Sequence, residues 1–385
     1  MAGERGERRP CGRELREHQL VGQIGFPVGA GVGKIVEVRM LVLGGSWFVG
    51  RVVVEQALNR GIDVTVFNRG RSGETPQDAR LIRGDREDLA HLRRLAEHGP
   101  WDVLVDVSGS VPAVVKQCAR VLAEAAARCV FVSTISVYRD WPHAPVEEDS
   151  ALWEGDPNAD PGTRAWDPDA YGPLKVGCEI AVREAFGDDR LLVLRPHVVL
   201  GRYEYVGRLP WWLSRMRRGG HVLAPGPDRP IQPIDVRDLA RFLLDQVDAS
   251  TTGIFNVAAP EHRATYGDML RACIAAVAGQ AENPAELVWV DEGWLTAQGV
   301  TQWTELPLWR NATAPWSMNT DRARAAGLRC HPIADTVADT WAWLRAGEHP
   351  VPHERFGEHG LAAASEAALL AQWHARSRAS WRTLD

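Results

Sequence analysis

The stretch Met40-Leu41-Val42-Leu43-Gly44-Gly45-Ser46-Trp47-Phe48-Val49-Gly50 decides which fold this sequence predicts. A short apolar run ends in two glycines, and apolar residues at helical spacing follow through Val54 and Leu58. This pattern predicts a buried strand, a tight turn and a helix whose free N–H groups and positive dipole end can bind an anion. A strand-to-helix turn without a ligand would show the same glycines, so other parts of the chain must decide between the two interpretations.

Trp47 occupies the position at which a dinucleotide-binding turn usually has its middle glycine. The residues of this turn that we expect to contact a dinucleotide are Gly44, Ser46, Trp47, Phe48, Val49 and Gly50.

The composition is that of a globular protein without a basic surface. Of the 385 residues, 45% are hydrophobic and 24% are charged, and the net charge is −6. This charge predicts no nucleic-acid partner, and no apolar run is long enough to span a membrane. The six cysteines are scattered without a C-x-x-C pair, which favours reduced thiols in a cytoplasmic protein and no metal site.

From Met40 onward, apolar runs alternate with helical patterns. The runs that predict strands are 40–43, 64–67, 79–83, 103–107, 130–133 and 191–194, and the helical patterns are 48–60, 89–97, 112–127 and 169–186. Continuous apolar strands separated by helices predict an α/β fold, a Rossmann-type doubly wound parallel sheet with a smaller C-terminal substrate-binding region.

The alternation also predicts where the regions begin and end. We expect a disordered extension at 1–36, a mainly dinucleotide-binding region at 37–200 and a mainly substrate-binding region at 201–348 with segments returning to the sheet. Residues 349–385 form a C-terminal tail whose apolar positions predict a helix that caps the fold or binds a partner.

Tyr171 and Lys175 are four residues apart, so they lie on one face of a predicted helix. An ammonium near a phenol lowers the phenol pKa, and such a tyrosine can exchange a proton while a nicotinamide exchanges hydride. Hydroxyl residues at Ser133, Thr134 and Ser136 follow the fifth strand, at the edge where open α/β sheets bind ligands. Each of these features also occurs by chance, as a surface pair or as caps of a strand end.

Together these segments resemble the short-chain dehydrogenase/reductase superfamily, in its extended branch of NAD(P)-dependent epimerases, dehydratases and reductases. The resemblance covers about residues 40–345. Further motifs that carry it are Gly84-Asp85, Leu194-Arg195-Pro196-His197-Val198-Val199-Leu200-Gly201, Ile234-Asp235-Val236-Arg237-Asp238-Leu239-Ala240 and Gly253-Ile254-Phe255-Asn256-Val257.

The resemblance implies a role for each matching residue. Tyr171 would exchange the proton, Lys175 would hold the nicotinamide ribose, and Thr134 would orient the substrate oxygen. Asp85 and Arg86 would lie near the adenine, and Pro196 and His197 by the nicotinamide.

Three departures from the family pattern modify these expectations. The first is Trp47, and the glycine turn followed by F-N-R-G resembles an atypical branch that includes plant chloroplast RNA-binding relatives. The second is Asn68, which replaces the acid that accepts the ribose 2′-hydroxyl of NAD, while Arg69 and Arg71 could pair with a 2′-phosphate. We therefore expect NADP, with NAD as the alternative. The third is Ile231, where sugar-nucleotide enzymes usually have an arginine for the substrate pyrophosphate.

The expected function is NADP(H)-dependent hydride transfer to or from a carbonyl or hydroxyl of a small molecule. Alternatives are a sugar-nucleotide epimerase or dehydratase with a tightly held cofactor, and a non-catalytic binding or regulatory relative. A homodimer through 112–127 and 169–186 would fit the resemblance. The residues expected to contact the substrate are Ser136, Trp166, Trp211, Trp212 and Trp303.

Overall fold

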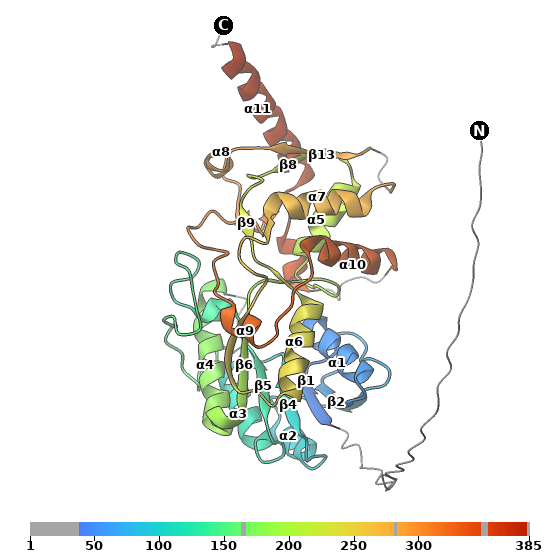
Figure 1. The fold of residues 1–385 in the computed structure, drawn as a ribbon, viewed down its shortest axis with the longest axis vertical. Helices are drawn as coiled ribbons and strands as arrows, with labels where there is room; N and C mark the ends of the chain where they lie inside the picture. Colours follow the sequence, from blue (N-terminus) through green and yellow to red (C-terminus); the bar gives the residue numbers. More distant parts are fainter. Residues whose placement is uncertain (1–37, 163–166, 281–282, 348–352, 383–385) are drawn as a thin grey trace, which may run out of the picture. The chain divides into compact units, whose positions relative to one another are not determined.

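A seven-stranded parallel sheet forms the centre of the fold (Figure 1). The computed structural model describes residues 38–162, 167–280, 283–347 and 353–382, and the predicted extension at 1–36 lies outside them. The strand order is β11-β6-β5-β4-β1-β2-β3, and every pairing is parallel. The prediction of a doubly wound parallel sheet is therefore confirmed.

The strands of this sheet follow the predicted apolar runs closely. Their bounds are β1 Arg39–Leu43, β2 Asp63–Asn68, β3 Arg80–Arg83, β4 Val103–Asp106, β5 Cys129–Val132, β6 Leu191–Pro196 and β11 Gly253–Val257. The helices are α1 Phe48–Asn59, α2 Leu89–Ala96, α3 Pro112–Leu122, α4 Pro168–Phe186, α5 Arg208–Arg217, α6 Val236–Asp248, α7 Tyr266–Val277, α8 Glu292–Ala297, α9 Asp321–Ala325, α10 Ile333–Arg345 and α11 Ala363–Arg382.

Helices cover both faces of the sheet. Alternate residues of each strand point to opposite faces, so each strand contributes side chains to two cores. In β1, Met40 and Val42 pack into a core with α1 and α6, whereas Leu41 and Leu43 pack into a second core with α2, α3 and α4. All four side chains are at most 1% exposed. The strands therefore read as continuous apolar runs.

A third core lies beyond the carboxyl edge of the sheet, where α5, α7 and α10 pack together (Figure 1). The short parallel pair β8 Gly220–Ala224 and β13 Ala285–Trp289 belongs to it. The segment 298–316 contains the short strands β14 Gln302–Trp303 and β15 Leu306–Pro307. From the same half of the chain, α6 and β11 return to the sheet.

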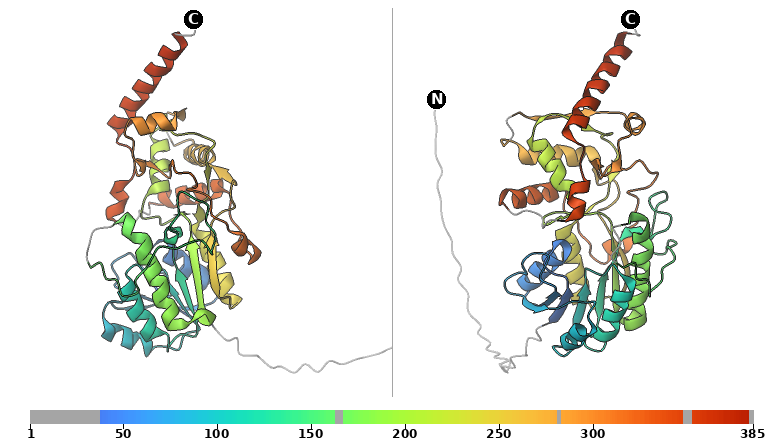
Figure 2. Two further views of the ribbon diagram at one scale, coloured as in Figure 1. Left: turned by 90° about the vertical axis from the view of Figure 1, so that its left-hand side faces the viewer. Right: turned by 180° about the vertical axis from the view of Figure 1, so that it is seen from behind.

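The predicted C-terminal helix is present as α11, and a buried ion pair holds its first turn. Arg215 Nε donates to Glu366 at 2.7 Å, and the backbone N–H of Leu223 donates to the same carboxylate at 3.2 Å. Leu369 packs into the third core. The rest of α11 extends away from these contacts (Figure 2).

Candidate active site

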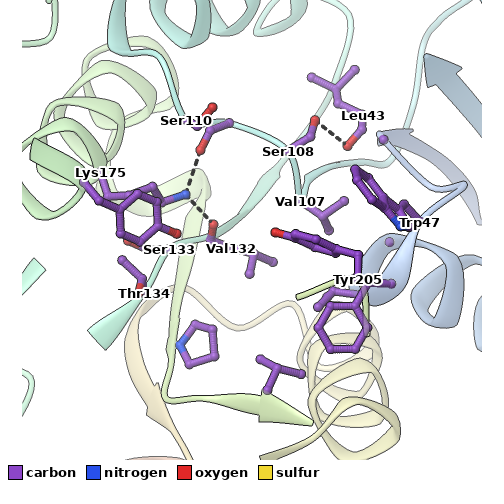
Figure 3. Close-up of a pocket in the computed structure, with 18 of the residues that line it drawn as sticks. Leu43, Trp47, Val107, Ser108, Ser110, Val132, Ser133, Thr134, Lys175 and Tyr205 are labelled. Atoms are coloured by element: carbon purple, nitrogen blue, oxygen red, sulfur yellow. Dashed lines mark hydrogen bonds between the residues drawn. The ribbon is translucent and has the colours of Figure 1, made fainter. Parts of the chain in front are cut away.

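A cavity of about 840 Å³ lies where the strands of the sheet end. The turns that follow β1, β2, β4, β5 and β6 line it on one side, and segments from the second half of the chain line it on the other (Figure 3). The glycine turn after β1 lies where the strand order changes direction between β1 and β4. Open α/β sheets bind their ligands at this place.

The glycine turn needs its glycines for two different reasons. Gly44 and Gly45 have φ angles of +109° and +84°, and a residue with a side chain would be strained at these angles. A Cβ on Gly50 would lie 2.7 Å from Gly45 N, so only glycine lets the first turn of α1 pass this close. Trp47 has an extended backbone with φ −138°, so its position does not need glycine for conformational reasons.

Asn68 ties the end of β2 to the glycine turn. Its Nδ2 donates to Gly44 O at 3.2 Å, and its Oδ1 accepts from Gly70 N at 2.7 Å. Arg69 lines the cavity, is half-exposed and lies 4.0 Å from the carboxylate of Asp85. Among the described residues, Arg71 does not line the cavity, because it follows the turn at Gly70.

Arg86 lines the cavity, and Asp106 and Ser108 hold its guanidinium in place. Its Nη2 donates to Asp106 at 2.7 Å, and its Nη1 donates to Ser108 Oγ at 2.9 Å. Burial opposes ionisation of Asp106, but the guanidinium outweighs it and lowers the carboxyl pKa. The pair fixes the turn after β4 against the turn after β3.

Tyr171, Thr134 and Ser136 lie in the same cavity. Thr134 Oγ1 accepts from Ser136 N at 3.2 Å, which also begins the short helical turn after β5. Burial raises the pKa of the Tyr171 phenol above its ordinary value, and Tyr205 adds to this. A hydrogen bond with Thr134 and the charge of Arg355 act in the opposite direction.

The Tyr171 pKa is thus raised, whereas the spacing of Tyr171 and Lys175 predicted a lowered one. The Lys175 ammonium donates to the carbonyl oxygens of Gly109 at 2.7 Å and Val132 at 2.8 Å (Figure 3). It also lies 4.3 Å from the centre of the Phe131 ring. These contacts hold the Lys175 ammonium at the carboxyl ends of β4 and β5. Burial lowers the pKa of Lys175 itself.

Pro196 and His197 line the cavity at the end of β6. His197 Nδ1 accepts from Val198 N at 2.7 Å, so Nε2 carries the proton and donates to Pro315 O at 2.9 Å. The ring stacks on Trp316 at a centroid distance of 4.7 Å. Burial lowers the His197 pKa to about 3, so the imidazole is neutral at physiological pH.

We expect His197 to make stability depend on pH. The unfolded chain takes up a proton at this residue below pH of about 6.5, whereas the folded chain does so only near the lowered pKa of about 3. Stability is therefore lost as pH falls through this window, by about 2 kcal/mol between pH 6.5 and pH 5. Urea unfolding at pH 7 and pH 5 should show a smaller loss for His197→Asn than for the unmodified chain. His262→Asn, at an exposed site, is the control, and equal losses in all three chains would contradict the prediction.

Among the tryptophans expected at the substrate, only Trp303 is found to line the cavity within the described residues. Trp212 is fully buried in the third core and donates to Pro307 O at 2.9 Å, and Trp211 packs against it at 4.7 Å. The prediction for Trp211 and Trp212 is corrected, because they belong to the packing of α5. Trp166 lies outside the described residues.

Several residues that line the cavity were not anticipated. Ser108, Gly109 and Ser110 follow β4 directly, so the small residues after an apolar run could have indicated them. Lining residues from later parts of the chain include Tyr205, Arg208, Arg310, His353 and Arg355. They come from distant segments, and no sequence pattern marks them.

The described part of the chain offers neither a metal site nor a membrane span. Among these residues, no group of three His, Cys, Asp or Glu side chains could hold a metal ion. None of the helices in the described part is both long and apolar enough to cross a bilayer.

The cavity and its sheet can be compared with known proteins. Over 257 residues the chain is 23% identical to the chloroplast stem-loop binding protein of 41 kDa b from Arabidopsis thaliana, a match that covers 62% of this chain and 63% of that protein. The chain thus spans less than two thirds of this relative. WbmH of Bordetella bronchiseptica in complex with NAD+ has a similar structure, with a TM-score of 0.61, 17% identity and coverage of 80% of this chain and 98% of that one. UDP-glucose 4-epimerase of Thermotoga maritima with UDP-glucose gives a TM-score of 0.59 at 18% identity, covering 80% and 99%.

A family model matches one continuous part of the chain. Residues 40–258 match the NAD dependent epimerase/dehydratase family, and this segment runs from β1 to the end of β11. It contains the glycine turn, Thr134, Tyr171 and Lys175. Since the match covers more than half of the chain, the protein belongs to the NAD dependent epimerase/dehydratase family.

Proposed function

We propose that this enzyme is an NADP(H)-dependent oxidoreductase that acts on a carbonyl or hydroxyl of a small molecule. The observation that carries the proposal is that Tyr171, Thr134 and Lys175 share one cavity with the glycine turn. The reaction class needs this combination, because a proton and a hydride must be exchanged at neighbouring atoms of one substrate.

Each of these side chains has a separate role in the proposed reaction. Tyr171 holds a proton, since burial raises its pKa, and a neutral phenol suits the donation of that proton to a carbonyl oxygen. Thr134 and Ser136 offer hydroxyls that orient the same oxygen. Lys175 holds the ends of β4 and β5 and would contact the nicotinamide ribose. When bound, the nicotinamide supplies or accepts the hydride.

The lining of the cavity fits an anionic dinucleotide. Although the chain carries a net charge of −6, the described residues that line the cavity include two carboxylates, Asp85 and Glu87, and more cations. The cations are Arg69, Arg86, Lys175, Arg208, Arg310 and Arg355. Gly50 lets the first turn of α1 pass close to Gly45, and this turn lines the cavity. The N-terminus of a helix favours the binding of phosphate.

We expect NADPH to bind more tightly than NADH. Asn68 is neutral, so it does not repel a 2′-phosphate, and Arg69 lines the cavity beside it. One good hydrogen bond to a charged group corresponds to about a tenfold to hundredfold preference. Calorimetry should show that Arg69→Ala removes most of the preference while the affinity for NADH stays nearly unchanged.

Arg71→Ala is the matched control, since this arginine does not line the cavity within the described residues. It should leave the preference unchanged. Equal affinity of the unmodified enzyme for both cofactors would contradict the expected preference for NADPH.

A second candidate is a sugar-nucleotide epimerase or dehydratase, and Arg310 favours it. This arginine lines the cavity and lies 4.5 Å from the Trp141 ring centre and 5.1 Å from that of Trp303. Among the described residues it forms no ion pair within 4.0 Å, so its charge could bind an anionic group of the substrate. Cofactor that stays bound through purification, with no net consumption of NADPH, would favour this candidate.

A third candidate is a binding protein without turnover, which the similarity to the stem-loop binding protein supports. Stem-loop binding by a variant that lacks Tyr171 would favour it. We also propose a homodimer through α3 and α4. We further propose a cytoplasmic location, since the described cysteines are all free. Light scattering of the purified chain tests the dimer.

A further inference from the structure

The segment 353–360, here named the C-terminal strap, returns from the end of the chain to the cavity. It comprises the short helical turn η3 Glu354–Glu358 and its flanking residues. The centre of the His353 ring lies 5.2 Å from that of Trp47 and 4.7 Å from that of Tyr205. The Trp47 and Tyr205 rings lie side by side (Figure 3), with their centres 4.4 Å apart. The strap therefore covers the residue that replaces the middle glycine of the turn.

The start of the strap packs on the Trp47 and Tyr205 rings, and its end is hydrogen-bonded to Thr304. His353 Nδ1 accepts from Arg355 N at 3.1 Å, which fixes the start of the helical turn. Gly360 N donates to Thr304 O at 2.8 Å, and a Cβ on Gly360 would overlap the Trp211 indole. The conformation that we describe is thus built into the packing of the third core.

The strap brings a cation into the cavity that the glycine turn and Tyr171 also line. The Arg355 side chain is 17% exposed, lines the cavity and has Glu358 at 3.5 Å, so its charge is partly compensated. Its charge is close enough to Tyr171 to lower the phenol pKa, while its neighbour His353 contacts the turn. A dinucleotide that runs from the turn to Tyr171 would pass beside Arg355.

We propose that the C-terminal strap is part of the dinucleotide site, with Arg355 binding the diphosphate and His353 seated against Trp47. This inference rests on the proposed function only for the cofactor class. With Trp47 in place of glycine, the turn presents an aromatic wall, and Arg355 adds positive charge on the same side. The strap lies outside the segment 40–258 that matches the family, so the family pattern does not supply it.

The test is calorimetry on the full chain with four probes. NADPH and ADP-ribose contain the diphosphate, adenosine 2′-monophosphate has no phosphate at the 5′ position, and UDP stands for a nucleotide substrate. Arg355→Gln should weaken the binding of NADPH and ADP-ribose by about tenfold to hundredfold and leave the affinity for adenosine 2′-monophosphate unchanged. Arg355→Lys should recover part of the loss because it keeps the charge. Arg345→Gln, at an exposed position at the end of α10, should change nothing.

A second measurement uses the unmodified chain, so it does not depend on the folding of any variant. NADPH should slow the hydrogen exchange of backbone amides in 353–360. Unchanged affinity of Arg355→Gln for ADP-ribose, or unchanged exchange in the strap, would overturn the inference. Weaker binding of UDP but not of ADP-ribose would also overturn it, by assigning Arg355 to a nucleotide substrate. If the unmodified chain binds no dinucleotide at all, the cofactor assignment fails instead.

Discussion

Replacing Tyr171 with phenylalanine is expected to lower turnover by about 10²–10⁴-fold. The variant keeps the ring, which lies in the cavity beside Thr134, and removes the proton that the reaction exchanges. The affinity for the cofactor should change little, since the hydroxyl is proposed to meet the substrate oxygen. The measurement is steady-state turnover with an identified substrate, together with calorimetry for cofactor binding.

The matched control is Tyr203→Phe. The Tyr203 hydroxyl donates to Glu55 at 3.0 Å and does not line the cavity within the described residues. This variant should keep its turnover within a few-fold of the unmodified enzyme. Near-normal turnover of Tyr171→Phe would show that another group exchanges the proton.

Replacing Arg195 with methionine is expected to reduce the free energy of unfolding by about 3–5 kcal/mol. Arg195 on β6 donates from Nη2 to Glu179 on α4 at 2.7 Å and from Nε at 3.0 Å, and both side chains are 1% exposed. The variant leaves a buried carboxylate without its cation. It also removes the Arg195 Nη1 group, which donates a hydrogen bond to the Tyr138 hydroxyl at 3.1 Å. Urea unfolding measures the loss.

Two further variants make this prediction specific. Arg183→Met breaks a pair with Asp188 in which the side chains are 37% and 85% exposed, so it should change stability by less than about 1 kcal/mol. The double variant Arg195→Met with Glu179→Leu should recover much of the loss, because no charge is then left buried. If Arg195→Met is as stable as the unmodified chain, the buried pair does not anchor α4, the helix that carries Tyr171 and Lys175.

Local pattern was enough to predict the sheet and the first half of the site. An apolar run such as Met40–Leu43 fills both cores of a parallel sheet, so it can hardly form another element once helices alternate with it. The turn after such a strand must lie at the carboxyl edge, so Gly44, Thr134 and Asn68 come together by topology alone. For this reason the strand ends agree with the predictions to within a residue or two.

Tryptophan content misled the prediction of the substrate side. An aromatic residue fills a core as well as it lines a pocket, and sequence periodicity does not separate the two uses. Trp212 and Trp303 therefore looked alike, although one is fully buried and the other faces the cavity. Only the packing of α5 against the third core decides between them.

The sequence by itself determined the fold class, the glycine turn, the spacing of Tyr171 and Lys175 on α4, and the neutral residue at the end of β2. These are local properties, set by periodicity and by residue type. The tertiary structure alone decided that Lys175 points to the carbonyl oxygens of Gly109 and Val132, and that Arg355 reaches the cavity. Such contacts join residues far apart in the chain, and their geometry follows from how three cores pack together.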